Sequence, residues 1–101
     1  MQEKDTGWTE FQIRCRALAE LLVAERGLTL ELARHRDGYL SGLVRPTKTP
    51  VELYIYEDEV GWTEGDLWWI CEYQDYPTPQ GMLDGFEQKF SASLGRQLPK
   101  Q

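Results

Sequence analysis

The stretch that decides the fold runs from Val51 to Tyr76 and reads VELYIYEDEVGWTEGDLWWICEYQDY. It holds seven of the twelve aromatic residues of the chain and eight of its carboxylates, and it contains no Lys, Arg or His. Its formal charge of −8 exceeds the −6 of the whole chain, so the other residues together carry +2. We therefore take this acidic, aromatic stretch as the centre of the molecule and the flanking segments as its support.

Two strands are predicted inside this stretch. Apolar residues alternate with Glu and Tyr from Val51 to Glu57, and a second alternation runs from Leu67 to Tyr73. A period of two, with β-branched and aromatic residues, is typical of strands. Residues 57–66 hold two glycines and five carboxylates, which predicts a loop. Both faces of the strands carry large side chains, so we expect the second face to be covered by a helix, a second copy or a partner.

The flanking segments predict two helices and a further hairpin. Thr9 and Gln12 have the spacing of a capping box, and an apolar stripe then runs to Gly27. Leucines alternate over residues 28–33, and a turn at 36–38 lets residues 39–44 return as a second strand. Thr78 and Pro79 are good N-cap and N1 residues for a helix that runs to about Gly95.

The predicted fold class is therefore α+β. It is a four-stranded antiparallel sheet of two hairpins, flanked by an N-terminal and a C-terminal helix in the order α-β-β-β-β-α. The 101 residues suit a single domain, 1–101, with flexible tails predicted at 1–7 and 96–101.

An alternative interpretation concerns residues 18–46. The run LAELLVAERGLT at 18–29, with YLSGLVR at 39–45 before Pro46, resembles the helix-turn-helix of phage-repressor-like DNA-binding proteins. In that family a helix ends in Gly-Leu-Thr, and a later helix carries Tyr-Leu-Ser before a basic exit. The resemblance implies a DNA-binding regulator whose phosphate contacts would come from Arg34, Arg36, Arg45 and Lys48. Strands across 28–45 would exclude this arrangement, whereas a helix there would favour it.

The composition argues against several other classes. The only His is His35, and the motifs of common hydrolases and nucleotide-binding enzymes are missing, so we predict a non-enzyme with no cofactor. The acids at 57–66 do not follow the EF-hand pattern, so no metal is predicted. Cys15 and Cys71 are too few for a zinc site and are expected to be buried thiols. The acidic balance disfavours direct nucleic-acid binding. No secretory signal is visible in the sequence, and no uncharged apolar run is long enough to span a membrane, so we expect a cytoplasmic protein.

These observations lead to a functional prediction. An aromatic surface rimmed with carboxylates suits a partner protein with a basic surface, through ion pairs and cation–π contacts. We predict an inhibitor, immunity or adaptor protein, similar in style to the phage-borne inhibitors that act as DNA mimics by occupying a nucleic-acid-binding site. A homodimer sealed through the second face is a further possibility. The predicted partner-binding residues are Tyr54, Tyr56, Glu57, Asp58, Glu59, Trp62, Glu64 and Trp68.

Overall fold

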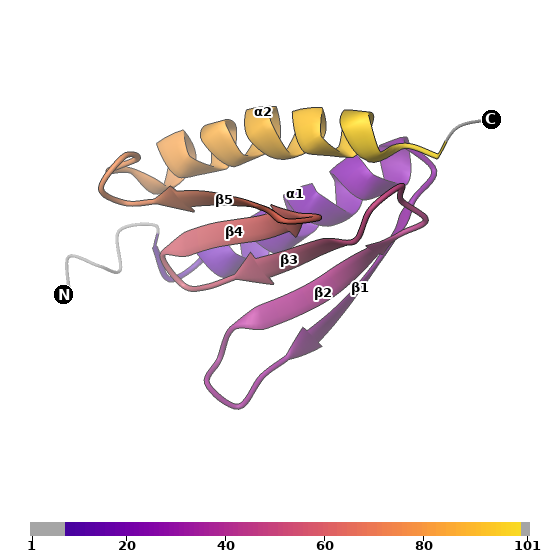
Figure 1. Cartoon of the computed structure of the whole chain (residues 1–101). Coiled ribbons are helices and arrows are strands. Elements are labelled where there is room, and N and C mark those ends of the chain that lie inside the picture. The colour runs from indigo at the N-terminus through magenta and orange to yellow at the C-terminus, as the bar shows by residue number, and fades with distance from the viewer. Residues whose placement is uncertain (1–7, 100–101) are drawn as a thin grey trace, which may run out of the picture.

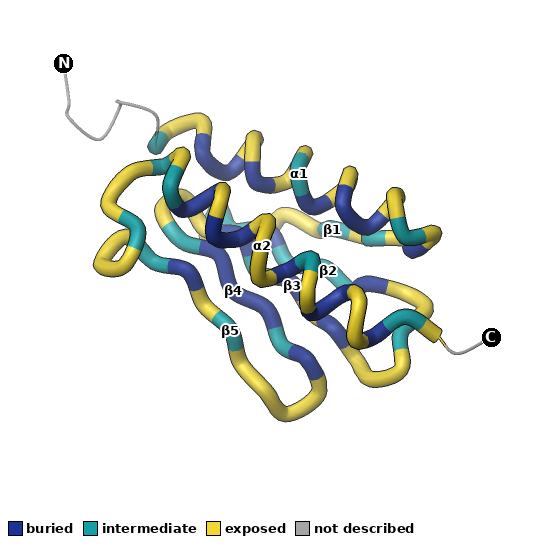
Figure 2. The backbone as a smooth tube through the Cα atoms, turned by 90° about the horizontal axis from the view of Figure 1, so that it is seen from above, coloured by how far each residue is buried: buried dark blue, intermediate teal, exposed yellow. Residues whose placement is uncertain are grey.

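The computed structural model describes residues 8–99, which form a five-stranded sheet with two helices on one face (Figure 1). The elements are α1 (Phe11–Glu25), β1 (Thr29–Arg34), β2 (Leu40–Arg45), β3 (Val51–Ile55), β4 (Glu59–Glu64), β5 (Leu67–Glu72) and α2 (Pro79–Gln97). Each strand pairs antiparallel with its neighbour in the chain, which gives the spatial order β1-β2-β3-β4-β5. The view from above shows α1 and α2 side by side over the strands (Figure 2). The α+β class, the antiparallel sheet and the two flanking helices are thus confirmed.

The predicted number of strands was wrong, because β4 occupies the segment expected to be a loop. In β4 the side chains of Val60, Trp62 and Glu64 point toward the helices, and the intervening residues point away. The turns on either side are short. The Tyr56 N–H donates to the Glu59 carbonyl (2.9 Å), and Gly65, with φ of 63°, helps to close the next turn. A positive φ favours glycine, so Gly65 marks a tight turn here.

Residues 28–45 form the predicted hairpin, which rules out the helix-turn-helix arrangement for 18–46. Leu32 of β1 pairs with Gly42 of β2, and the connecting turn contains Gly38 with φ of 95°. Gly42 fits only as glycine, because a Cβ there would collide with the Glu31 carbonyl and the Leu32 side chain. Gly42 is therefore required for close packing between two strands.

The helices pack by the stripes that the sequence predicts. The buried residues of α1 include Phe11, Cys15 and Leu22, and α2 begins with Thr78 as N-cap, whose side chain accepts from the Gly81 N–H (3.1 Å). Gln12 is not a capping residue. Its amide instead donates to the carbonyls of Gly38 and Ile55, both at 3.0 Å, and so ties α1 to the sheet.

The end of α2 also differs from expectation. The helix continues through Arg96 and Gln97, which were predicted to lie in a tail. The predicted tail at 1–7 and the last two positions of the chain lie outside the described residues. Within residues 8–99, no helix has the length and apolar character to cross a membrane.

The core lies between the helices and the sheet and is centred on Trp62. Its ring meets Phe86 and Phe90 of α2 edge-on, with centroid separations of 5.5 and 5.2 Å. Cys15 and Cys71 are both buried in this core as free thiols, as predicted. The large apolar side chains of three consecutive strands point to the helices, and both helices lie on that side of the sheet. Within residues 8–99, no element covers the opposite face.

Candidate protein-binding face

The face of the sheet turned away from α1 and α2 is called the open face. Alternation along each strand and the pairing register assign its side chains. From β1 to β5 they are Thr29, Glu31, Ala33, Ser41, Leu43, Arg45, Glu52, Tyr54, Glu59, Gly61, Thr63, Trp68, Ile70 and Glu72. Tyr39 and Tyr56, which flank β2 and β3, continue the same alternation.

Large apolar side chains gather at the β3–β5 side of the open face, and we name Tyr54, Tyr56, Trp68 and Ile70 the apolar strip. Trp68 is 66% exposed and Ile70 is 48% exposed. Tyr54 and Trp68 stack with their ring centroids 5.8 Å apart, although β4 lies between their strands. Exposed apolar side chains gathered on one face of a sheet are typical of an interaction surface.

Gly61 of β4 lies between β3 and β5 on the open face. It pairs with Tyr54 on one side and with Ile70 on the other, and it has no side chain to separate them. A Cβ at Gly61 would lie 3.0 Å from the Trp69 carbonyl oxygen, which is closer than ordinary packing permits. The backbone of β5 and the Ile70 side chain thus lie close to this glycine, which is itself buried.

Carboxylates share the two outer rows of the apolar strip. Glu31 and Glu52 lie in the row of Trp68, and Glu59 and Glu72 lie in the row of Tyr56. The Tyr54 hydroxyl donates to Glu52 (3.3 Å), and burial together with this carboxylate raises the pKa of Tyr54. Partial burial, followed by the charges of Asp58 and Glu72, raises the pKa of Glu59. Among the open-face strand residues named above, Arg45 is the one cation. The rim is therefore strongly acidic.

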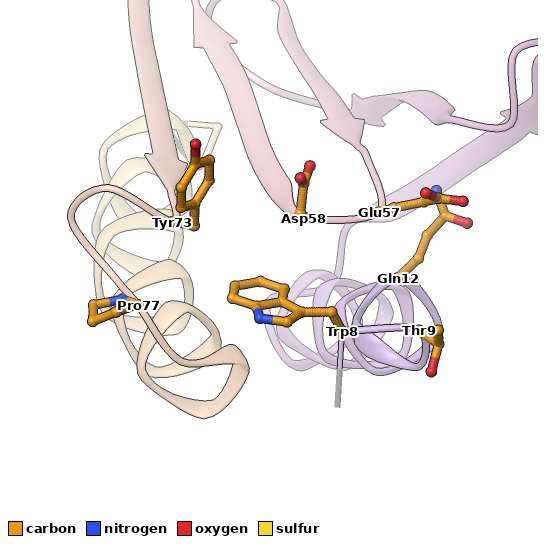
Figure 3. A pocket seen from close by; sticks show the side chains of 7 residues that line it. All are labelled: Trp8, Thr9, Gln12, Glu57, Asp58, Tyr73 and Pro77. Carbon is orange, nitrogen blue, oxygen red and sulfur yellow. The ribbon is translucent and has the colours of Figure 1, made fainter. Parts of the chain in front are cut away.

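At one end of the sheet a hollow of about 750 Å³ opens between the β3–β4 turn, the start of α1 and the segment after β5 (Figure 3). The ring of Trp8 projects into it, and Tyr73 and Asp58 lie to one side. Glu57 and Asp58, both predicted as binding residues, are exposed here. Aromatic rings beside carboxylates form a favourable environment for an ammonium or guanidinium group.

Two predicted binding residues do not belong to this surface. Trp62 is fully buried and Glu64 is 6% exposed, because both lie on the helix-facing side of β4. The prediction assumed that they stood in a solvated loop, and the strand places them in the core. The other six predicted residues lie on the open face or in its adjoining turn: Tyr54, Tyr56, Glu57, Asp58, Glu59 and Trp68.

Glu64 instead belongs to a buried polar network that joins β4 to α2. Arg96 donates to both of its carboxylate oxygens (2.8 and 3.0 Å), and Gln97 and Ser93 donate at 2.8 and 3.1 Å. The Trp62 indole N–H in turn donates to Ser93 (2.9 Å). The hydrogen bonds from Arg96, with those from Gln97 and Ser93, lower the pKa of Glu64 to about 2. This network stabilises the fold.

Several residues of the face were not chosen from the sequence. Ile70, Glu52 and Glu72 share the period-two alternation of Tyr54 and Trp68, and this signal was sufficient to find them. Leu43 and Tyr39 depend on the register of the first hairpin, which single-sequence patterns do not reveal. His35 lies at the Tyr39 end of the open face as well, because it stacks on Tyr39 with ring centroids 4.3 Å apart and hydrogen-bonds to Ser41.

Other chemistry has less support in the geometry. Within residues 8–99, no three His, Cys, Asp or Glu side chains are grouped in a way that could hold a metal ion. Comparison of the chain with protein-family models, with curated proteins and with solved structures found no match.

Proposed function

We propose that the protein is a protein-binding module that docks through its open face on a basic surface of a partner protein. The observation that carries the proposal is the apolar strip, in which Tyr56, Trp68 and Ile70 are exposed on a sheet face that no element of residues 8–99 covers, with carboxylates in its two outer rows. Contiguous apolar patches of this kind mark interaction sites, and Trp and Tyr are the residues that most often dominate binding energy.

Charge gives the proposed partner its chemistry. The acidic rim attracts Lys and Arg, and the exposed rings of Trp68 and Tyr56 offer faces for cation–π contacts. Such a module would act as an inhibitor, an immunity protein or an adaptor. In a narrower form of the proposal, the two rows of carboxylates would occupy a site at which the partner otherwise binds nucleic acid, and competition with a duplex would test this form.

The test compares matched changes on two sides of the molecule. Proteins that bind the purified chain are identified, and the affinity of each is measured by calorimetry against four variants. Glu52→Lys and Trp68→Ala alter the open face. Glu87→Lys makes the same charge change on the exposed side of α2, and Leu21→Ala removes an exposed apolar side chain from α1.

We expect the two open-face variants to lose affinity by about 10- to 100-fold, since interface hot spots cost roughly 2 kcal/mol or more. The two controls should bind like the parent chain. Affinity should also fall with added salt, because the rim charges are exposed. Equal effects on both sides, or affinity insensitive to salt and to Glu52→Lys, would contradict the proposal.

A further inference from the structure

Strand β5 is an edge of the sheet and carries exposed apolar side chains along its length. Leu67, on the helix side, is 58% exposed, and Trp68 and Ile70 are exposed on the open face. Within residues 8–99, no strand pairs with the outer side of β5. Edge strands are normally protected by charge, proline, a bulge or a covering segment, because their free backbone groups accept another strand.

The register identifies which backbone groups of β5 point outward. A two-residue turn joins Glu64 to Leu67, so these residues form a hydrogen-bonded pair, and the pairing alternates from there. The N–H groups of Trp68, Ile70 and Glu72 therefore point to the free edge. The Glu72 carbonyl accepts from the N–H groups of Asp75 and Tyr76, both at 3.0 Å, which limits the edge to the segment before it.

The opposite edge, β1, is built differently. By the same alternation its outward groups belong to Leu30, Leu32 and Arg34, because the His35 N–H donates to the Tyr39 carbonyl (2.8 Å). Arg34 is a charged residue on that edge and donates to the Gly38 carbonyl (3.2 Å). Leu30 and Leu32 pack against the core and are only partly exposed. The unprotected edge of the sheet is thus β5.

We propose that the partner adds an extended segment to β5, with Lys or Arg facing the open face and apolar residues beside Leu67 and Trp69. The inference rests on the proposed function, since it states how the basic partner engages the same face. The outward N–H groups belong to the residues whose side chains form the β5 border of the open face. One segment therefore makes main-chain hydrogen bonds and reaches the acidic rim together.

The charge of the edge favours this occupant over a second copy. Carboxylates stand at both ends of β5, with Asp66 before it and Glu72 and Asp75 at its end, and the strand contains no Lys or Arg. Antiparallel pairing of two β5 strands would bring these acids of one copy against those of the other, which is unfavourable. A basic segment neutralises them.

The probe is a synthetic peptide of alternating Val and Lys, about eight residues long, which matches a common strand length. Amide hydrogen exchange is followed by NMR with and without saturating peptide. We expect exchange at Trp68, Ile70 and Glu72 to slow by roughly tenfold or more, because each amide gains a partner or is shielded. The outward amides of β1 at Leu30 and Leu32 serve as the internal control and should not change.

A substitution tests the same point from the protein side. Ile70→Pro removes an outward N–H that the sheet does not use, and such edge positions tolerate proline. We expect peptide affinity to fall by roughly tenfold, and by clearly more than in Ile70→Val, which shortens the same side chain but keeps the N–H. Circular dichroism shows whether Ile70→Pro is folded, and the exchange experiment on the parent chain does not depend on that variant.

The outcomes separate the two proposals. No peptide binding, or binding that leaves the three amides unprotected and is equal in Ile70→Pro, would overturn strand addition. If the peptide bound without protecting the three amides, and if this binding were lost in Glu52→Lys, the proposed function would stand. Binding unaffected by Glu52→Lys would count against the proposed function itself. Protection of the same amides without peptide, rising with protein concentration, would show a second copy at β5 and overturn the basic segment.

Discussion

Trp62 and Trp68 lie six residues apart on neighbouring strands and face opposite sides of the same sheet. Trp62 is enclosed by Phe86, Phe90 and Ser93, whereas Trp68 stands 66% exposed beside Tyr54. The two residues are chemically identical. The alternation of side chains along each strand directs Trp62 into the core and Trp68 to the open face. The comparison teaches that one sheet can serve both purposes through its two faces, and substitutions at the two positions test this conclusion.

The largest expected effect is the difference between Trp62→Ala and Trp68→Ala in the free energy of unfolding. Trp62→Ala should destabilise the protein by about 3–5 kcal/mol, because it leaves a large cavity beside Phe86 and Phe90 and removes the hydrogen bond from the indole N–H to Ser93. Trp68→Ala should cost about 1 kcal/mol or less, chiefly the stacking with Tyr54. Urea unfolding measures both. Trp62→Phe, which keeps a ring, provides a folded intermediate case, and similar losses for both alanine variants would refute the distinction between the faces.

The next effect compares two carboxylates, Glu64 in the core and Glu52 on the open face. The folded pKa of Glu64 is about 2, below its ordinary value of 4.5, so its stabilisation is complete above that ordinary value. The stabilisation is lost as pH falls from about 4.5 to about 2 and amounts to roughly 3 kcal/mol at neutral pH.

Glu64→Gln should therefore be destabilised by that amount at pH 7 and should approach the parent chain near pH 2. Glu52→Gln should stay within about 0.5 kcal/mol of the parent, since its carboxylate is exposed. Unfolding by urea across pH 2–7 measures both variants. Parallel stability curves for Glu64→Gln and the parent chain would exclude the role assigned to this carboxylate.

The smallest effect has the opposite sign and belongs to the acidic rim. The pKa of Glu59 is raised, so its charged form opposes folding at neutral pH, and this opposition fades as pH falls through the raised pKa. Glu72→Gln removes the facing charge and should lower the pKa of Glu59 and raise stability by about 0.2–1 kcal/mol.

An NMR titration of the Glu59 carboxyl carbon measures this shift. Glu57→Gln is the control. It removes an equal charge from the β3–β4 turn next to Glu59, but Glu57 does not face Glu59 across a strand pair. If both variants moved the pKa of Glu59 alike, the cause would be general charge reduction and not the cross-strand pair.

The sequence predicted most of the architecture and missed one strand. The alternations at 51–57 and 67–73 identified β3 and β5, and the helical stripes identified α1 and α2, because their apolar periods are unbroken. In β4 the period is present, but Glu59, Gly61 and Glu64 hide it, since neither carboxylates nor glycine are typical of strands. A buried Glu64 in this strand needs a partner for its charge, and that partner, Arg96, lies 32 residues away in the chain.

The same error limited the prediction of the face. Because a loop is predicted at 57–66, Trp62 and Glu64 are predicted to be exposed and are included with Tyr54 and Trp68 among the partner-binding residues. The helices also had two possible faces, and the sequence did not decide between them. Both lie on one side because the residues at 51, 53, 55, 60 and 62 form the larger apolar surface. The open face follows from that choice, while its role in binding is a proposal.

The separation of the two faces also has a consequence for protein engineering. The open face is made of strand residues whose side chains do not enter the core, so Leu43, Tyr54, Trp68 and Ile70 can be randomised together while the helix-facing positions stay constant. Gly61 should be kept, because a Cβ there would lie 3.0 Å from the Trp69 carbonyl oxygen. The sheet is thus a scaffold on which a library of binding surfaces can be displayed.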